Sequence, residues 1–135
     1  MTTTIADVRT ALAQAVSETG LRCFPYLEDQ IPQPCAFVEV RRRDPRMVFS
    51  EASAVHNFTV RCYFQRSAAR SGQIEMDQYR EQSGATSIVA AVQNDTYWPD
   101  SLVQYVQVTE ISDTFVTEHA GTEYLSMAFE IEVCW

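Results

Sequence analysis

The segment from Glu123 to Trp135 alternates between apolar and polar side chains almost without interruption. Its apolar positions are Leu125, Met127, Phe129, Ile131 and Val133. Its polar or small positions are Ser126, Ala128, Glu130 and Glu132. A period of two predicts a β-strand that buries one face and exposes the other. Because Trp135 follows this strand directly, we expect the end of the chain to be built into the fold.

Helical spacing predicts a first helix that begins after Thr4 and ends at Gly20, with Thr4 and Asp7 as its N-terminal cap. The other expected elements are a short strand at 21–24, strands at 35–40 and 54–65, a polar helix at 71–82, a short helix at 87–93, and a strand at 103–111 that turns near 118–121 into the last strand. We expect the strands at 35–40 and 54–65 to pair as an antiparallel hairpin.

Strands that follow one another in hairpins, with helices grouped between them, favour an α+β fold. We therefore expect one antiparallel or mixed β-sheet of about five strands, with the helices packed on one face. At 135 residues the chain is long enough for one hydrophobic core, and no linker or internal repeat divides it. The sequence predicts a single domain over residues 1–135.

Charge is distributed unevenly along the chain, which has a net charge of −8. Lysine is absent, and all ten arginines lie at or before Arg80, accompanied there by nine acidic residues. The segment 81–135 has nine acidic residues and no arginine. A protein that binds nucleic acid typically carries a basic stripe, so this balance argues against such a function. It suits a protein that does not hold DNA, or one that lets DNA slide past.

No apolar run approaches the ~20 residues of a membrane-spanning helix. The N-terminus has neither the basic stretch nor the apolar core of a signal peptide. We therefore expect a protein that is made in a cytoplasm and has no membrane partner.

Motifs of the common enzyme classes are missing from the sequence. There is no glycine-rich phosphate loop and no histidine motif of a metalloenzyme or hydrolase. His56 has the parity of core residues and His119 falls in a predicted turn, so neither is expected to be a ligand. Glu130 and Glu132 could imitate a pair of catalytic carboxylates, but the exposed side of the last strand explains them better. We expect no catalytic residue, no cofactor and no enzymatic activity.

The four cysteines, Cys23, Cys35, Cys62 and Cys134, are widely spaced and lie in apolar or strand-like contexts. They could form two disulfides or a metal site, or they could remain buried free thiols. Metal ligands usually come in closely spaced pairs, which this sequence lacks. The pattern therefore favours free thiols without a bound metal.

A cluster of basic and apolar side chains follows the expected strand at 35–40. It comprises Arg41, Arg42, Arg43, Arg46, Met47 and Phe49. We expect these residues in a long connection that projects from the domain between two strands. One interpretation is a solvated loop; the other is a protein–protein contact, because arginine binds carboxylates bidentately and is enriched at interfaces. In a self-associating ring, this cluster would meet the acidic strand faces of a neighbouring copy.

Several segments, taken in order, resemble the tail terminator (tail completion) proteins of long-tailed phages that infect actinobacteria. They are 76–79, 83–87, 90–92, 106–108, 121–125 and 128–133, together with the opening helix, 20–22 and 31–34. The likeness spans nearly the whole chain, and it rests on the ordered set because no single motif is specific. The sequence departs at Ala120, where these proteins often have glycine, and at Ala85, where they have proline.

The resemblance implies a virion protein, assembled in the host cytoplasm, that forms a homohexameric ring on the last ring of the tail tube. Such a ring ends tube polymerisation and provides the joint to the head connector or stopper protein. DNA then passes through its lumen without specific binding. One alternative is another head–tail joining protein, such as a stopper or neck component. The alternative from a different class is a small cytoplasmic enzyme or a ligand-binding domain with a pocket between helices and sheet.

Overall fold

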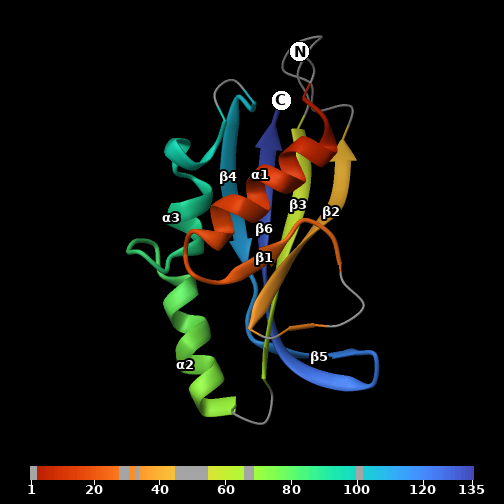
Figure 1. Cartoon of the computed structure of the whole chain (residues 1–135), viewed down its shortest axis with the longest axis vertical. Helices are drawn as coiled ribbons and strands as arrows, with labels where there is room; N and C mark the ends of the chain where they lie inside the picture. Colours follow the sequence, from red (N-terminus) through yellow and green to blue (C-terminus); the bar gives the residue numbers. More distant parts are fainter. Residues whose placement is uncertain (1–2, 28–30, 33, 45–54, 66–68, 100–101) are drawn as a thin grey trace.

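The computed structural model describes residues 3–27, 31–32, 34–44, 55–65, 69–99 and 102–135. Its elements in chain order are α1 (Ile5–Ser17), β1 (Arg22–Phe24), β2 (Cys35–Asp44), β3 (Val55–Gln65), α2 (Ala69–Arg80), α3 (Ile88–Val92), the 3₁₀ helix η2 (Asp95–Tyr97), β4 (Tyr105–Ile111), β5 (Phe115–His119) and β6 (Thr122–Cys134). The six strands form one mixed sheet. In Figure 1, α1 crosses in front of this sheet and α3 and α2 follow one another along its left side. The expected α+β class is confirmed.

The two longest strands, β3 and β6, form the centre of the sheet. They pair without interruption from Val55 opposite Cys134 to Gln65 opposite Tyr124. Strand order is β1-β2-β3-β6-β4, and β5 also pairs with β6. Since β3 occupies one edge of β6, strands β4 and β5 share the other edge. Only the pairing of β1 with β2 is parallel, and the expected antiparallel hairpin of β2 and β3 is present.

The main hydrophobic core lies between the helices and one face of the sheet. The strands supply Phe58, Val60, Phe64, Met127, Phe129 and Ile131 to it, and all six are fully buried. The helices supply Val8, Leu12, Val16, Met76, Ile88 and Val92, which are also fully buried. Burying one such side chain contributes roughly 1.5–3 kcal/mol to folding. The period-two pattern of the strands therefore determines which face the helices cover.

The first helix begins with the expected cap. The Asp7 N–H donates to Thr4 Oγ1 at 3.2 Å, and the Thr4 N–H donates to Asp7 Oδ2 at 3.0 Å. This reciprocal pair satisfies two N–H groups that the first turn of a helix leaves without an intrahelical partner. After the helix, Gly20 has a φ of +95°, which a residue with a side chain rarely adopts, and the chain continues into β1.

Strand β2 is longer than the sequence pattern predicts. We expected it to end at Val40, but it continues through Arg41, Arg42 and Arg43 to Asp44. A bulge between Val40 and Arg42 shifts the register, and pairing with β3 then resumes until Asp44 lies opposite Val55. The bulge breaks the alternation in the sequence while the backbone hydrogen bonds continue, so the pattern alone signals an end that does not occur.

The strand expected at 103–111, and its continuation to the last turn, form two separate elements. β4 ends at Ile111 and β5 begins at Phe115. Between them, Ser112 Oγ accepts from the Ala128 N–H at 2.8 Å, and the Ser112 N–H donates to the Ala128 carbonyl at 2.9 Å. Arg80 from α2 donates to the Ser112 carbonyl at 3.1 Å. The Ser112 hydroxyl thus accepts the hydrogen bond that a backbone carbonyl would accept in a regular strand, and the strand is interrupted there.

Candidate interaction surface

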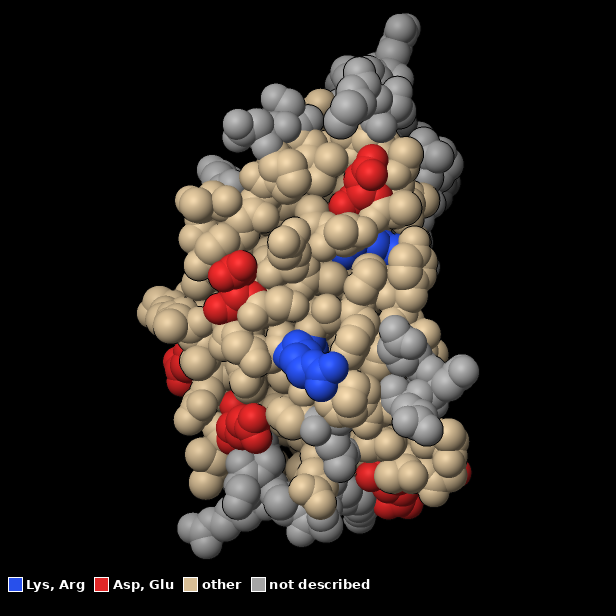
Figure 2. Space-filling model, viewed as in Figure 1, with Lys and Arg blue, Asp and Glu red and all other residues tan. Residues whose placement is uncertain are grey.

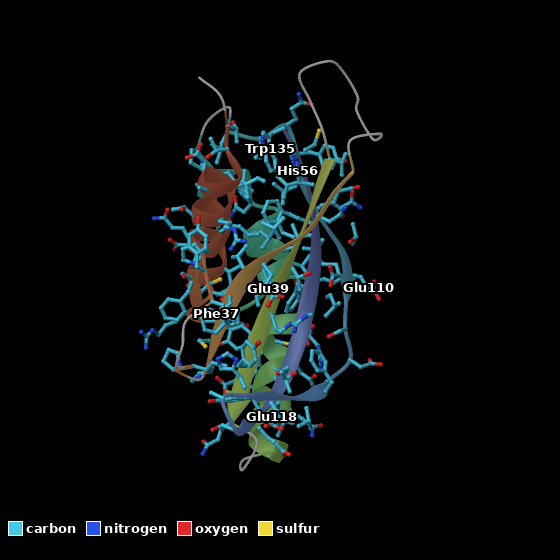
Figure 3. All side chains as sticks on the ribbon, turned by 90° about the vertical axis from the view of Figure 1, so that its right-hand side faces the viewer. Phe37, Glu39, His56, Glu110, Glu118 and Trp135 are labelled. Carbon is cyan, nitrogen blue, oxygen red and sulfur yellow. The ribbon has the colours of Figure 1, made fainter. Side chains whose placement is uncertain are left out.

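In the described part of the chain, no helix covers the second face of the sheet. Registered residues on this face form a row across the four strands β2, β3, β6 and β4. The row contains Glu39, Thr59, Glu130 and Glu110. Glu39 and Glu130 are half-buried and Glu110 is exposed, whereas Thr59 is buried between them. Figure 3 shows Glu39 near the middle of the sheet and Glu110 at its β4 side.

An ion pair lies at the β2 end of this row. Arg61 Nη2 is 3.5 Å from Glu39 Oε2, and both side chains are 35% exposed. The same guanidinium interacts with the Tyr63 hydroxyl, although burial dominates at that site and raises the pKa of Tyr63. Partly exposed pairs of this kind typically contribute at most about 1 kcal/mol to stability. The more important effect of this ion pair is that the guanidinium of Arg61 already interacts with Glu39 and Tyr63.

Carboxylates gather at the opposite end of the row. Glu110 of β4 lies directly opposite Glu130 of β6, and Glu132 follows on the same face, opposite Gln107. Glu130 Oε2 accepts from the Thr59 hydroxyl at 3.0 Å. Burial raises the pKa of Tyr105, and the neighbouring carboxylate of Glu132 raises it further. We name the three residues Glu110, Glu130 and Glu132 the carboxylate row.

Sequence reasoning placed Ser126, Ala128, Glu130 and Glu132 on the exposed side of the last strand. Glu130 and Glu132 are half-buried between buried neighbours, whereas Ser126 and Ala128 on the same side are buried, so that side is not open along its whole length. Sequence reasoning did not predict that Glu110 lies beside Glu130 and Glu132. The register shift between Val108 and Glu110 puts Glu110 opposite Glu130. The signal in the sequence was the three-residue step from Val108 to Ile111, both of which pack against the core, because a strand without a bulge would keep steps of two.

An aromatic cluster covers the lower part of the same face. Its rings are Phe24, Phe37, Tyr63 and Tyr124, one from each of β1, β2, β3 and β6. Consecutive ring centroids are 5.5, 5.7 and 5.7 Å apart, within the usual range for aromatic pairs. Ile31 packs against this cluster and Phe37 is fully buried. Hence the accessible groups of this face include the half-buried and exposed carboxylates of the row, whereas Thr59 between them is buried.

The arginines of the predicted contact cluster lie at the β2 edge of the sheet. Arg42 is opposite Asn57, and Arg43 is opposite His56. Our expectation that Arg41, Arg42 and Arg43 belong to a projecting connection was wrong, because backbone pairing with β3 continues through them. The other three residues of the predicted cluster, Arg46, Met47 and Phe49, lie outside the described part of the chain.

All four cysteines and both histidines lie in strands of the sheet. All four cysteines are free thiols; Cys35, Cys62 and Cys134 are buried and Cys23 is half-buried. His56 is 3% exposed and stacks on Trp135 with ring centroids 3.6 Å apart, while His119 ends β5. Among the residues that the structure describes, no three cysteine, histidine or acidic side chains are grouped so that they could hold a metal ion. No helix in that part is long and apolar enough to cross a membrane.

The two sides of the sheet therefore differ in how they present charge. On the helix-covered side, Figure 2 shows acidic and basic side chains scattered among uncharged ones. On the other side, register brings Glu110 and Glu130 into direct opposition. A surface of this kind is suited to binding a partner through charge. Comparison of the chain with models of protein families and with curated proteins gives no match.

Proposed function

We propose that this chain is a phage tail terminator, which caps the tail tube as a homohexameric ring. In this role it ends tube polymerisation and forms the joint to the head connector or stopper protein, and DNA passes through the ring without specific binding. It is a structural component rather than an enzyme. It is assembled in the host cytoplasm and remains in the virion, in the tail, at the head–tail junction.

The observation that carries this proposal is that, among the described residues, helices cover only one of the two faces of the sheet. Helices α1, α2 and α3 pack on one face, whereas the charged row from Glu39 to Glu110 occupies the other without a described helix. A protein that acts by contacting other proteins needs accessible groups, and charged groups such as these carboxylates set orientation and partner choice. The ordered likeness of the sequence to tail terminators supports a role for this surface in tail assembly.

The position of the arginines supports assembly. Backbone pairing of β2 with β3 continues to Asp44, so Arg41, Arg42 and Arg43 belong to a strand rather than to a loop. Arginine is enriched at protein interfaces, and its guanidinium binds carboxylates bidentately. We therefore retain the proposal that Arg41, Arg42, Arg43, Arg46, Met47 and Phe49 contribute to a protein interface.

The test is a tube-capping assay. Purified chain is added to polymerising tail tube protein, and tube lengths and tube ends are measured by electron microscopy. We expect shorter tubes with a six-fold ring of extra density at one end. An unrelated acidic protein of similar size serves as the control for charge alone. A folded chain that leaves both tube length and tube ends unchanged would refute the proposal; binding to the connector with unchanged tube growth would indicate a stopper or neck protein instead.

A further inference from the structure

Side chains meet the outer backbone of the sheet on its β1 side. A strand with a neighbour on only one side leaves N–H and C=O groups without a partner, and another chain can pair with them. On β1, the Cys23 N–H donates to Ser17 Oγ of α1 at 3.2 Å. On β2, beyond its pairing with β1, the Val38 carbonyl accepts from Arg9 Nη1 at 3.1 Å. Both strands on this side therefore have part of their outer backbone occupied by α1.

On the other side of β6, the edge of the sheet is divided between β4 and β5. The Val108 N–H of β4 donates to Gln93 Oε1, at the end of α3, at 3.0 Å. The backbone of β5 differs, because within the described part of the chain its hydrogen bonds are made with β6 alone. Figure 1 shows β5 at the lower end of the sheet, away from α1 and α3. We therefore regard β5 as an open edge strand.

The turn after β5 determines which of its backbone groups face outward. His119 lies opposite Thr122 across a two-residue turn. The pair that closes such a turn exchanges both of its backbone hydrogen bonds. Because hydrogen-bonded pairs alternate along an antiparallel ladder, the N–H and C=O groups of Val116 and Glu118 point away from β6.

The same two residues have exposed side chains. Val116 is 50% exposed, although it lies opposite Leu125 of the main core. Glu118 is exposed, as is Asp113 just before β5, and neither carboxylate makes an ion pair with a residue that the structure describes. A strand added at this edge would therefore cover an apolar side chain and meet negative charge.

We infer that the outer edge of β5 binds an extended segment of a partner protein as an additional strand, with an apolar residue opposite Val116 and an arginine or lysine opposite Glu118. Apolar pairs and opposite charges directly across adjacent strands stabilise a sheet, and backbone hydrogen bonds supply the rest of the affinity. A second copy of β5 is a poorer match, because it would bring the Glu118 and Asp113 carboxylates of both copies together, and β5 has no lysine or arginine. The inference goes beyond the proposed tail function and does not depend on it.

The probe is a short synthetic peptide, blocked at both ends, in which threonine alternates with one arginine and one valine. Antiparallel pairing places its arginine opposite Glu118 and its valine opposite Val116. Amide hydrogen exchange of the full chain, followed by NMR, gives the readout. In the free chain, the amides of Val116 and Glu118 should exchange faster than that of Thr117, which bonds to β6. At a peptide concentration of about ten times Kd, exchange at Val116 and Glu118 should slow by about tenfold.

Two control peptides separate strand addition from simple attraction between charges. N-methylation of the peptide backbone on the side that faces β5 removes its N–H donors and should weaken binding by about tenfold or more. Replacement of the peptide's arginine by glutamate should weaken binding by about fivefold or more.

Two variants of the chain test the same contact from the other side. Val116→Pro removes an outward N–H without breaking a bond to β6, which an edge strand tolerates, and it should weaken peptide binding by about tenfold. Glu118→Arg should transfer the preference to the glutamate peptide. Protection of the Thr117 amide in both variants shows that the hairpin of β5 and β6 is intact.

The inference is overturned if the arginine peptide leaves exchange at Val116 and Glu118 unchanged, or if the N-methylated peptide binds equally well. It is also overturned if exchange at these two amides slows as the concentration of the chain alone is raised, because a second copy would then be the occupant. The tube-capping assay does not involve this peptide, so the proposed function is tested separately.

Discussion

Single residues at the top of the sheet join distant parts of the chain. Trp135 stacks on His56 of β3, and its indole N–H donates to the Thr3 carbonyl at 3.1 Å. The Thr3 hydroxyl in turn donates to the Leu102 carbonyl at 2.7 Å. The segment before β4 and the residue after β6 are therefore both linked to the segment before α1 through Thr3.

We predict that Trp135→Ala lowers the free energy of unfolding by about 2 kcal/mol, because the ring is half-buried and loses both its stack and its hydrogen bond. Trp135→Phe keeps an aromatic ring but loses the N–H donor, and it should lower the free energy by about 1 kcal/mol. Urea unfolding followed by circular dichroism measures both values. Equal stability of all three proteins would show that this contact does not stabilise the fold.

The cysteine thiols make stability depend on alkaline pH; Cys35 and Cys62 are buried, and the half-buried Cys23 packs against the main core. Burial raises the pKa of Cys23 to about 12 and that of Cys35 to about 11, and it raises the pKa of Cys62 well above its usual value. In the unfolded chain a thiol has a pKa of about 8.5. The folded state therefore holds these protons more tightly, and stability that is fully present below about pH 8.5 is lost as pH rises toward the folded values.

We predict that the free energy of unfolding falls between about pH 9 and pH 11, by up to about 1.4 kcal/mol per pH unit for each buried thiol. The pKa values of Tyr63 and Tyr79 are also raised, mainly by burial, and act in the same direction. The matched variant Cys62→Ala keeps both tyrosines, so its shallower decline isolates one thiol. Urea midpoints measured across this range provide the comparison, and parallel curves for the two proteins would contradict the prediction.

At the scale of elements, the hairpin of β5 and β6 contains a strained turn. Ala120 has a φ of +51° and Gly121 a φ of +83°. Positive φ at both central residues is typical of a type I′ hairpin turn, which asparagine and glycine favour. Alanine in this conformation is less favourable by about 1 kcal/mol, because its Cβ crowds the following carbonyl.

We predict that Ala120→Asn raises the free energy of unfolding by about 0.5–1 kcal/mol, because asparagine tolerates the left-handed conformation. Gly121→Ala should lower it by about 1 kcal/mol. No atom lies within 4 Å of a Cβ added at Gly121, so backbone strain rather than collision would cause that loss. Thermal unfolding of the two variants tests both signs; a destabilised Ala120→Asn would mean that the turn has another conformation.

The molecule as a whole divides its charge between the two edges of one sheet. Arg41, Arg42 and Arg43 belong to β2 on one side of the central strands, and the carboxylate row belongs to β4 and its neighbour β6 on the other. Contacts between oppositely charged surfaces weaken as salt screens them, over a Debye length of about 10 Å at 0.1 M.

We predict that replacing Arg41, Arg42 and Arg43 with serine leaves the chain folded but weakens its assembly. The backbone pairing of β2 with β3 does not depend on the arginine side chains, so we expect stability to change little, whereas the lost charges act on association. The unaltered chain should dissociate as salt rises from about 0.05 to 1 M, and the serine variant should show little further dependence. Sedimentation and thermal unfolding measure the two effects. A sharp drop in melting temperature would mean that β2 needs these arginines to fold.

Much of the fold could be predicted from local pattern. The alternation of Phe58 and Val60 in β3, and of Phe129 and Ile131 in β6, correctly identified the core face, because burial of one strand face imposes a period of two. The cap at Thr4 followed from side-chain chemistry close in sequence. The class of fold, the hairpin of β2 and β3 and the gathering of helices on one face all follow from such local rules.

The candidate site depended on tertiary structure, for two physical reasons. Bulges after Val40 and after Val108 displace the register by one residue. The three-residue step from Val108 to Ile111 signals the second bulge, but the sequence does not report which residue of the neighbouring strand each residue then faces. The distribution of charge along the chain was evident, but which carboxylates share a face depends on strand order. By itself the sequence determined a two-faced sheet with an acidic C-terminal part. Only the pairing of strands far apart in the chain placed Glu110 opposite Glu130 and put the arginines of β2 on the other edge.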